Sequence, residues 1–385
     1  MKIALVCPYD YAHPGGVAIH IANLYEELKK MGHDVRVITP FSGNSSVRGN
    51  KDIIPMGRPV AIPSGGSIAR VTLSPFLMSP VRAILGRENF DIIHIHEPLA
   101  SALTVSVLHV SNTTNVGTFH AYHSSTWRYR LIRPLVKRCY KKLHGKIAVS
   151  AAARDFIGKH FPGDYAIIPN GVDVEHFSTP LPPVKGLRDG KLNILFVGRP
   201  EKRKGLRYLL AAYKIVKQEL PQTRLVVVGP GTHKYQVKAR KAKLEDVIFT
   251  GFVPNADLPA YYQTADVFCS PAIGEESFGI VLLEAMAASK PIVACQIKGY
   301  ASVMSDGVQG LMVPPKDEVA LAKALIQLLK NKDLRLAMGA RGRLKAEECS
   351  WPNVASKVNE YYKSLLNAAQ SQPTTKTMHG KKVKV

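Results

Sequence analysis

The stretch Val267–Cys295, VFCSPAIGEESFGIVLLEAMAASKPIVAC, contains the pattern on which the fold prediction rests. It begins with a short apolar run, Val267–Ser270, continues with helical periodicity from Gly279 to Ala288, and ends on a second apolar run, Ile292–Cys295. Short runs that are apolar throughout are typical of strands covered on both faces of a parallel sheet. A strand, a helix and a second parallel strand form a right-handed crossover unit.

The same alternation extends in both directions along the chain. Further predicted strands are Ile3–Cys7, Val35–Thr39, Ile92–His96, Val116–His120, Ile147–Ser150, Ala166–Pro169, Ile194–Val197, Leu225–Val228, Ile248–Thr250 and Leu311–Val313. Predicted helices are Val17–Met31, Ser150–His160, Gly205–Glu219, Glu318–Asn331, Asp333–Cys349 and Val354–Leu366. This repetition predicts an α/β protein with two doubly wound sheets.

The chain length and one proline-rich stretch predict two domains. A chain of 385 residues exceeds the usual size of one domain. The stretch Ser178–Val184, STPLPPV, is the predicted linker, so the domains are 1–180 and 181–362, and 363–385 holds the end of a returning helix and a basic tail. Because ligands of open α/β sheets bind beyond the carboxyl ends of the strands, we expect a site in the cleft between the domains.

Composition limits the partners and the compartment. The net charge of +23 favours anionic partners, namely nucleic acid, acidic lipid or phosphorylated ligands. Nucleic acid is the weaker alternative among these partners. The sequence has no recognised nucleic-acid-binding motif and no basic stripe with interleaved aromatic residues. Five cysteines without a C-x-x-C pair fit the reducing cytoplasm. No run approaches the roughly 18 apolar residues of a membrane span, so any membrane contact is expected to be peripheral.

Two predicted loops have the composition of phosphate sites. Gly15 and Gly16 precede the first helix, where backbone N–H groups and the helix dipole favour an anion, although two glycines also suit an ordinary turn. Neither a G-x-G-x-x-G nor a P-loop pattern is present, which argues against a nicotinamide dehydrogenase and a P-loop enzyme. In the second half, Arg199 and Lys204 surround the start of a helix, where cations oppose the macrodipole unless an anion binds there. The alternative is a solvated basic loop.

The loop and the helix inside the opening stretch hold two acids that could bind a substrate. Glu276 lies in the loop, where it can accept hydrogen bonds from sugar hydroxyls, and Glu284 follows about two turns along the helix, within reach of a ribose. The N–H groups of Gly279, Ile280 and Val281 would form another anion site at the helix start. The alternative is a capping acid together with an exposed helix acid.

Taken in order, these motifs resemble glycosyltransferase family 4, and most of all its phosphatidyl-myo-inositol mannosyltransferases. The matching motifs are Pro14–Val17, His94–Pro98, Thr118–His120, Ile168–Asp173, Gly198–Arg199, Arg203–Gly205 and the pair Glu276 and Glu284. The likeness extends from about Met1 to Tyr362.

The resemblance implies the GT-B fold, with two Rossmann-like domains facing across a deep cleft. It implies a hexosyltransferase that acts with retention, without a metal or other cofactor. The donor would be GDP-mannose or a UDP-sugar, with mannose the leading expectation. The acceptor would be a membrane lipid of the phosphatidylinositol type or a glycolipid, reached on the inner face of the cell membrane. A soluble sugar phosphate or polysaccharide precursor is the alternative acceptor.

The resemblance also assigns roles to residues. Gly16, Arg199 and Lys204 would contact the donor diphosphate, Glu276 the sugar and Glu284 the ribose, while His120 would lie beside the reacting sugar. Val253, Gly279, Ile280 and Val281 would complete the nucleotide site, and Tyr9 and Arg70 would contact the acceptor.

Three departures from the family pattern leave the substrates open. Ser64–Gly65 replaces a larger polar pair and Ser125 replaces a lysine, both at positions that help to grip inositol phosphate. Asn255 stands where an acid that reads guanine is expected.

Two segments are candidates for membrane contact. Arg128–Lys146 is basic and amphipathic, and we expect its apolar stripe to pack inward and its basic face to meet anionic lipid. Ile68–Arg87 is either a lipid-seeking loop or a buried connection. His94, His96 and Glu97 suggest a metal site, but no third ligand with suitable spacing follows, so no metal is predicted.

Overall fold

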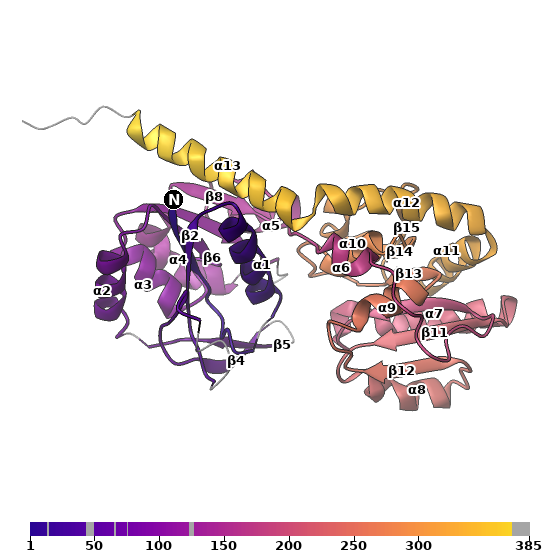
Figure 1. The fold of residues 1–385 in the computed structure, drawn as a ribbon. Coiled ribbons are helices and arrows are strands. Elements are labelled where there is room, and N and C mark those ends of the chain that lie inside the picture. The colour runs from indigo at the N-terminus through magenta and orange to yellow at the C-terminus, as the bar shows by residue number, and fades with distance from the viewer. Residues whose placement is uncertain (14, 44–49, 65–66, 75, 123–126, 372–385) are drawn as a thin grey trace, which may run out of the picture.

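The computed structural model describes residues 1–371 apart from 14, 44–49, 65–66, 75 and 123–126, with only the backbone described for 64, 67, 127–132 and 135. Two parallel sheets, each between layers of helices, lie side by side and define an N-terminal and a C-terminal half (Figure 1). Alternate residues of a strand face separate cores: Ala4 and Val6 lie in one, Ile3 and Leu5 in another. This two-sided burial explains why the strands are apolar throughout.

The sheet of the N-terminal half has the order β3-β2-β1-β6-β7-β8-β9. Its strands are β1 (Lys2–Val6), β2 (Asp34–Thr39), β3 (Ile53–Pro55), β6 (Ile92–His96), β7 (Thr114–Phe119), β8 (Gly145–Ala148) and β9 (Ala166–Ile167). The helices of this half are α1 (Gly16–Lys30), α2 (Met78–Glu88), α3 (Ala102–Val110), α4 (Trp127–Tyr140) and α5 (Ala151–Gly158). A separate antiparallel hairpin joins β4 (Val60–Ser64) to β5 (Ser67–Val71).

The sheet of the C-terminal half has the order β12-β11-β10-β13-β14-β15. Its strands are β10 (Leu192–Val197), β11 (Thr223–Val228), β12 (Val247–Gly251), β13 (Val267–Ser270), β14 (Ile292–Cys295) and β15 (Gly310–Val313). The longer helices around it are α7 (Leu206–Glu219), α10 (Ile280–Ala287), α11 (Glu318–Lys330) and α12 (Lys332–Glu348), with the shorter α8 (Gln236–Lys241) and α9 (Leu258–Thr264). In both sheets the order reverses beside the first strand, which is where open α/β sheets bind ligands.

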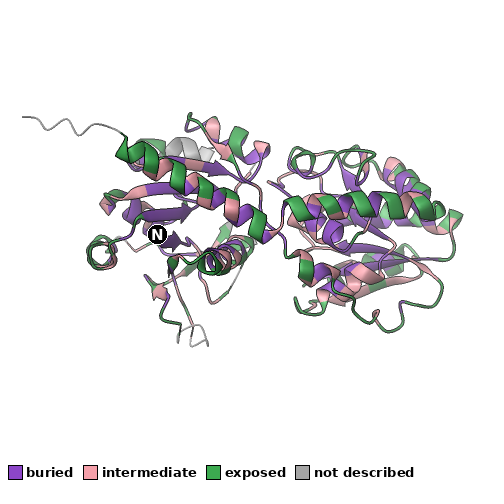
Figure 2. Ribbon diagram, turned by 45° about the horizontal axis from the view of Figure 1, so that its top comes forward, coloured by how far each residue is buried: buried purple, intermediate pink, exposed green. Residues whose placement is uncertain are grey.

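The chain passes twice between the halves, and the two passages contact each other. Val172 N–H donates to Cys349 O at 2.9 Å, and the ring of Trp351 packs where a side chain on Gly171 would stand, 2.4 Å from the ideal Cβ. Helix α6 (Val174–Ser178) then packs on α9 and α10, upstream of the predicted boundary at 180. Helix α13 (Trp351–Gln370) returns along the N-terminal half and packs on α1 (Figure 2).

The sequence predicted the doubly wound architecture correctly but not all of its elements. The edge strand β3 and the hairpin β4–β5 were not predicted, because short strands that contain proline and polar residues have no buried apolar run. The basic helix predicted over 128–146 ends at Tyr140, because the chain turns there and begins β8 at Gly145.

The two candidate membrane segments differ in the structure. In α4, Val136, Cys139 and Tyr140 are buried, as expected for an inward apolar stripe. The segment 68–87 contains both the exposed Phe76 and the buried Leu77, so neither description of it holds throughout. Pro14, Gly65 and Ser125 lie outside the described residues. Among the described helices, none combines the length and apolarity needed to cross a bilayer.

Candidate functional site

A cavity of about 590 Å³ opens between the two halves. Seven of the predicted site residues line it: Tyr9, Gly16, Arg70 and His120 from the N-terminal half, and Arg199, Lys204 and Ile280 from the C-terminal half. The polypeptide brings them together because each follows a strand at the carboxyl edge of its sheet or lies on a segment beside that edge. The expected cleft is therefore present, while the roles given to its residues remain predictions.

The C-terminal rim of this cavity, which we define as Arg199, Arg203, Lys204 and Glu276, is charged. One carboxylate oxygen of Glu276 accepts a hydrogen bond from Arg203 Nη1 at 2.6 Å and forms an ion pair with Lys204 Nζ at 2.8 Å. The Lys204 side chain is 17% exposed and that of Glu276 10%, so these groups are held in place rather than solvated as a loose loop. Arg203 also pairs with Glu201 at 2.7 Å, so Arg203 and Lys204 face two acids, and Arg199 adds a further positive charge to the cavity lining.

A glycine fixes the position of these cations. Gly205 has a φ of +71°, and a Cβ there would lie 1.8 Å from the carbonyl oxygen of Pro271. Only glycine permits this close approach. The approach brings the loop after β10 against the loop after β13, where Ile273 N–H donates to Arg203 O at 2.8 Å.

Two helix N-termini, one from each half, face the same cavity. Helix α1 begins after Gly15 and α10 after Gly279, and in neither does a side chain cap the helix. The first N–H groups of a helix have no partner within the helix, so they are available to an anion. Gly16 and Ile280 both line the cavity.

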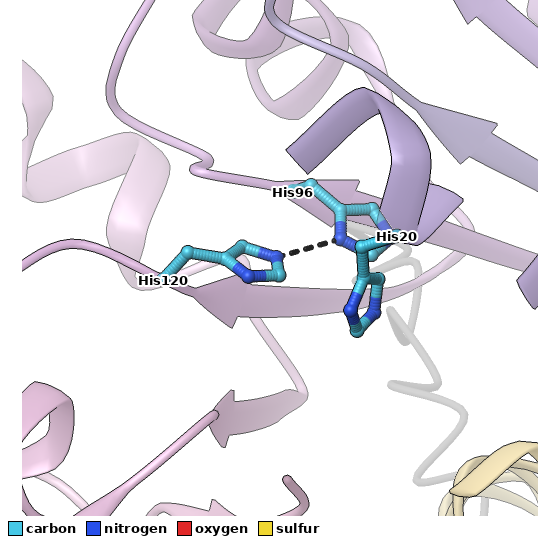
Figure 3. Close-up of side chains that lie close together, drawn as sticks. All are labelled: His20, His96 and His120. Atoms are coloured by element: carbon cyan, nitrogen blue, oxygen red, sulfur yellow. Dashed lines mark hydrogen bonds between the residues drawn. The ribbon is translucent and has the colours of Figure 1, made fainter. Parts of the chain in front are cut away.

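The N-terminal rim, which we define as His120 at the cavity with His20, His96 and Glu97 next to it, is buried. Figure 3 shows its three histidines. Nδ1 of His96 lies 3.0 Å from Nε2 of His120. The backbone N–H groups of His120 and Ala121 donate to one oxygen of Glu97 at 2.6 and 2.7 Å. The strand register explains the contact, because His96 on β6 pairs with Thr118 on β7, two residues before His120.

Burial sets the protonation of this rim. It lowers the pKa of His20 to about 4, and it lowers the pKa of His96 and His120 well below the ordinary value. Burial also raises the pKa of Glu97 to about 7, against the two N–H donors that favour its ionised form. At neutral pH the imidazoles are therefore uncharged, in contrast to the C-terminal rim.

Three histidines of this rim have metal-ligand spacing. Ligand atoms of His20, His96 and His120 lie within 4.8 Å of one another. The sequence instead suggested His94, His96 and Glu97 as metal ligands. Of these, only His96 belongs to the histidine cluster, and the two nitrogens of His94 contact Tyr362 Oη at 2.5 Å and Thr118 Oγ1 at 2.6 Å. Because His96 and His120 already bond to each other, an ion would have to displace that contact.

Five predicted site residues do not line the cavity: Glu276, Gly279, Val281, Glu284 and Val253. Glu284 accepts a hydrogen bond from Tyr262 Oη at 2.6 Å, and burial raises its pKa. Val253 lines a separate cavity of about 460 Å³, together with Leu181 and Tyr261.

Several residues of the site had no predicted role. Asn170 lines the cavity, and its Oδ1 lies 3.0 Å from Nδ1 of His20. Asn170 and Arg203 stand in motifs that marked the family, which is a signal for them. His20 is one of several residues on an apolar helix face, and no sequence pattern distinguishes it.

Comparisons with known proteins identify the family. The model for Glycosyltransferase Family 4 matches residues 14–176, and the model for Glycosyl transferases group 1 matches residues 178–345. A phosphatidyl-myo-inositol mannosyltransferase of Mycobacterium leprae is 37% identical over 96% of this chain and 98% of its own. The chain belongs to glycosyltransferase family 4. A protein of the same description from Mycolicibacterium smegmatis is 34% identical over 96% of this chain and 95% of its own.

The solved structures agree on the fold. Anabaena HepE, solved in complex with UDP and glucose, has a TM-score of 0.75 at 19% identity and covers 94% of this chain and 100% of its own. The predicted GT-B fold is thereby confirmed. As a member of family 4 the protein is an enzyme, a hexosyltransferase, and the nucleic-acid alternative has lost its support.

Proposed function

We propose that this glycosyltransferase transfers a mannosyl group, with retention of configuration, from a nucleotide-sugar to a phosphatidylinositol-type lipid. The observation that carries the proposal is the single cavity that joins the charged C-terminal rim to the neutral N-terminal rim. A departing nucleoside diphosphate needs cations and N–H donors, whereas the sugar needs hydrogen-bonding groups that do not attract water.

The donor would bind with its diphosphate against the C-terminal rim. Arg199, Lys204 and the start of α10 are preorganised for the negative charge that develops as the bond to the sugar breaks. Glu276 would accept hydrogen bonds from the sugar hydroxyls while it holds Lys204 in place. In this proposal no metal or other cofactor takes part, and Arg199 and Lys204 supply the positive charge at the diphosphate.

The acceptor would approach from the hairpin β4–β5. Tyr9 forms a β-bridge with Val71, and Asp10 N–H donates to Arg70 O at 2.9 Å, which fixes the hairpin beside the cavity. In the hairpin and the segment after it, Ile68 is 62% exposed and Phe76 is 85% exposed. A cation next to exposed apolar side chains suits a phospholipid headgroup and its acyl chains.

The relatives favour this acceptor and this sugar. The two mycobacterial relatives are described as phosphatidyl-myo-inositol mannosyltransferases, and they align over nearly the whole chain. We therefore place GDP-mannose first among the donors. UDP-sugars follow, because Asn255 replaces the expected acid and its backbone oxygen lies 3.0 Å from Nε2 of His176.

The test is a transfer assay with purified protein and liposomes of defined composition. Radiolabelled GDP-mannose, UDP-glucose and UDP-N-acetylglucosamine are each offered with phosphatidylinositol, with diacylglycerol and with soluble sugar phosphates. We expect label in the lipid phase only with GDP-mannose and phosphatidylinositol. Transfer to a soluble acceptor, or transfer only from a UDP-sugar, would contradict the proposed substrates.

We also propose that the protein works as a peripheral protein on the inner face of the cell membrane. The basic face of α4, with Arg133, Lys137 and Arg138 exposed, and the apolar residues near Phe76 would make the contact. Flotation with phosphatidylglycerol vesicles tests this. We expect binding at low salt that weakens as salt rises, and absence of binding at every salt concentration would contradict it.

A further inference from the structure

The contact between His96 and His120 sets a condition on where their protons lie. Nδ1 of His96 and Nε2 of His120 are 3.0 Å apart, and a nitrogen–nitrogen hydrogen bond needs one proton between them. Burial lowers the pKa of both rings, so both are neutral and each carries one proton. If His96 donates from Nδ1, then His120 must accept at Nε2 and must hold its own proton on Nδ1.

The other nitrogen of His96 decides which of the two rings donates the shared proton. Nε2 of His96 is fully buried and has no hydrogen-bond partner among the described residues. A buried N–H group without an acceptor is among the rarest defects in folded proteins, and it costs the full desolvation of a donor. The proton of His96 is therefore better placed on Nδ1, where His120 accepts it.

Asn170 favours the same arrangement from the opposite side. Its side-chain oxygen lies 3.0 Å from Nδ1 of His20, and an amide oxygen can only accept. A hydrogen bond with Asn170 also raises the pKa of His120, although burial and the neighbouring histidines outweigh it. Figure 3 shows Nε2 of His120 turned to His96, so Nδ1 is the nitrogen left for this acceptor.

We propose that His96 is a positioning residue that holds His120 in the tautomer with its proton on Nδ1. His120 then has no free lone pair, because Nε2 accepts from His96. In the function proposed above, on which this part rests, His120 beside the reacting sugar is therefore neutral and cannot act as a proton-abstracting base. The inference concerns His96, which does not line the cavity.

The experiment reads the tautomer directly. Protein labelled with ¹⁵N in histidine is studied by long-range ¹H–¹⁵N correlation, and His120 is assigned by its loss in the His120→Asn variant. We expect the unmodified protein to show a protonated Nδ1 and an unprotonated Nε2 at His120. The opposite tautomer would overturn the proposal, and this result does not depend on whether the substrates have been identified correctly.

Two variants of His96 test its part in this. His96→Leu removes the donor, whereas His96→Asn places an amide nitrogen close to the position of Nδ1. We expect His96→Leu to lose the tautomer preference and about tenfold in kcat, the scale of one hydrogen bond, with the KM for donor unchanged. His96→Asn should restore most of the tautomer preference and most of the kcat.

The outcomes separate the proposals. Failure of every donor to react would contradict the proposed function but leave the tautomer measurement intact. A His96→Leu protein that keeps both the Nδ1–H tautomer and the normal kcat would overturn the role of His96. Thermal unfolding of both variants checks that they fold, and if His96→Leu does not, the tautomer in the unmodified protein and in His96→Asn still decides.

Discussion

The two rims of the cleft differ in how they treat charge. On the C-terminal rim, Lys204 and Arg203 share the carboxylate of Glu276 at 2.8 and 2.6 Å. On the N-terminal rim, burial keeps His20, His96 and His120 neutral. In the proposed function, the contrast teaches that the negative charge of the departing diphosphate would meet cations on the C-terminal rim, while the N-terminal rim adds no charge beside the sugar.

The largest effect is expected on the C-terminal rim. Lys204→Ala removes one preorganised cation, so we expect kcat to fall by about 10²–10³-fold, with the fold intact. The neighbouring Lys202 is exposed and does not line the cavity, so Lys202→Ala is the matched control and should stay close to wild type. Glu276→Ala should act in the same direction as Lys204→Ala. Normal turnover in both site variants would contradict the assignment of Lys204 and Glu276 to the active site.

Acid should destabilise the N-terminal half first. The pKa of His20 is lowered from 6.5 to about 4, so its contribution is full above pH 6.5 and is lost as the pH falls toward 4, by about 3 kcal/mol. His94, with a pKa lowered to about 3, acts in the same sense. Glu97, whose pKa is raised to about 7, opposes them, because its contribution is lost as the pH rises from 4.5 through 7.

Hydrogen exchange at pH 7 and pH 5 measures this difference between the halves. The histidines of the C-terminal half, His176 and His233, are not buried, so that half should respond less. The quantity compared is the protection factor, in which the exchange rate is corrected for the intrinsic effect of pH. We expect protection to fall in β6 and β7 before it falls in β10 and β13. An earlier fall in the C-terminal half would contradict the comparison.

Two glycines at the helix starts should respond differently to the same substitution. A Cβ on Gly16 meets nothing within 4 Å, so Gly16→Ala should fold normally and raise the KM for donor about tenfold, because the methyl group takes the space of the diphosphate. Gly279 has a φ of +103°, and its Cβ would lie 2.7 Å from Tyr300, so Gly279→Ala should lose about 1–3 kcal/mol of stability. Thermal unfolding and donor kinetics of both variants check this. A destabilised Gly16→Ala protein would contradict the account.

The smallest effect is expected from chelation. The rims supply cations and neutral imidazoles, so EDTA should leave the rate unchanged and the purified protein should hold no stoichiometric metal. A rate lost with EDTA and restored by zinc would instead assign an ion to His20, His96 and His120.

The sequence predicts the fold well because burial on both faces makes each central strand apolar throughout. The runs at Ile92 and Val267 are apolar at consecutive positions, and both are interior strands of their sheets. Strand β3 and the hairpin β4–β5 have no such apolar run, since they lie at an edge or outside the main sheets.

The site could be predicted only as far as loop positions determine it. Arg199, Lys204 and His120 follow strands, so topology alone brings them to one cleft. The contact of His96 with His120 depends on the pairing of His96 with Thr118, and a single sequence does not specify which strands are neighbours. The pairing of Lys204 with Glu276 likewise requires Gly205 to pack on Pro271, a tertiary approach with no local signal.

A crystal structure of the protein with a bound nucleotide-sugar tests the central claim most directly. The account predicts the diphosphate within hydrogen-bonding distance of Arg199, Lys204 and the first N–H groups of α10, with the sugar between Glu276 and His120. A diphosphate bound elsewhere, for example in the cavity beside Val253, would contradict it.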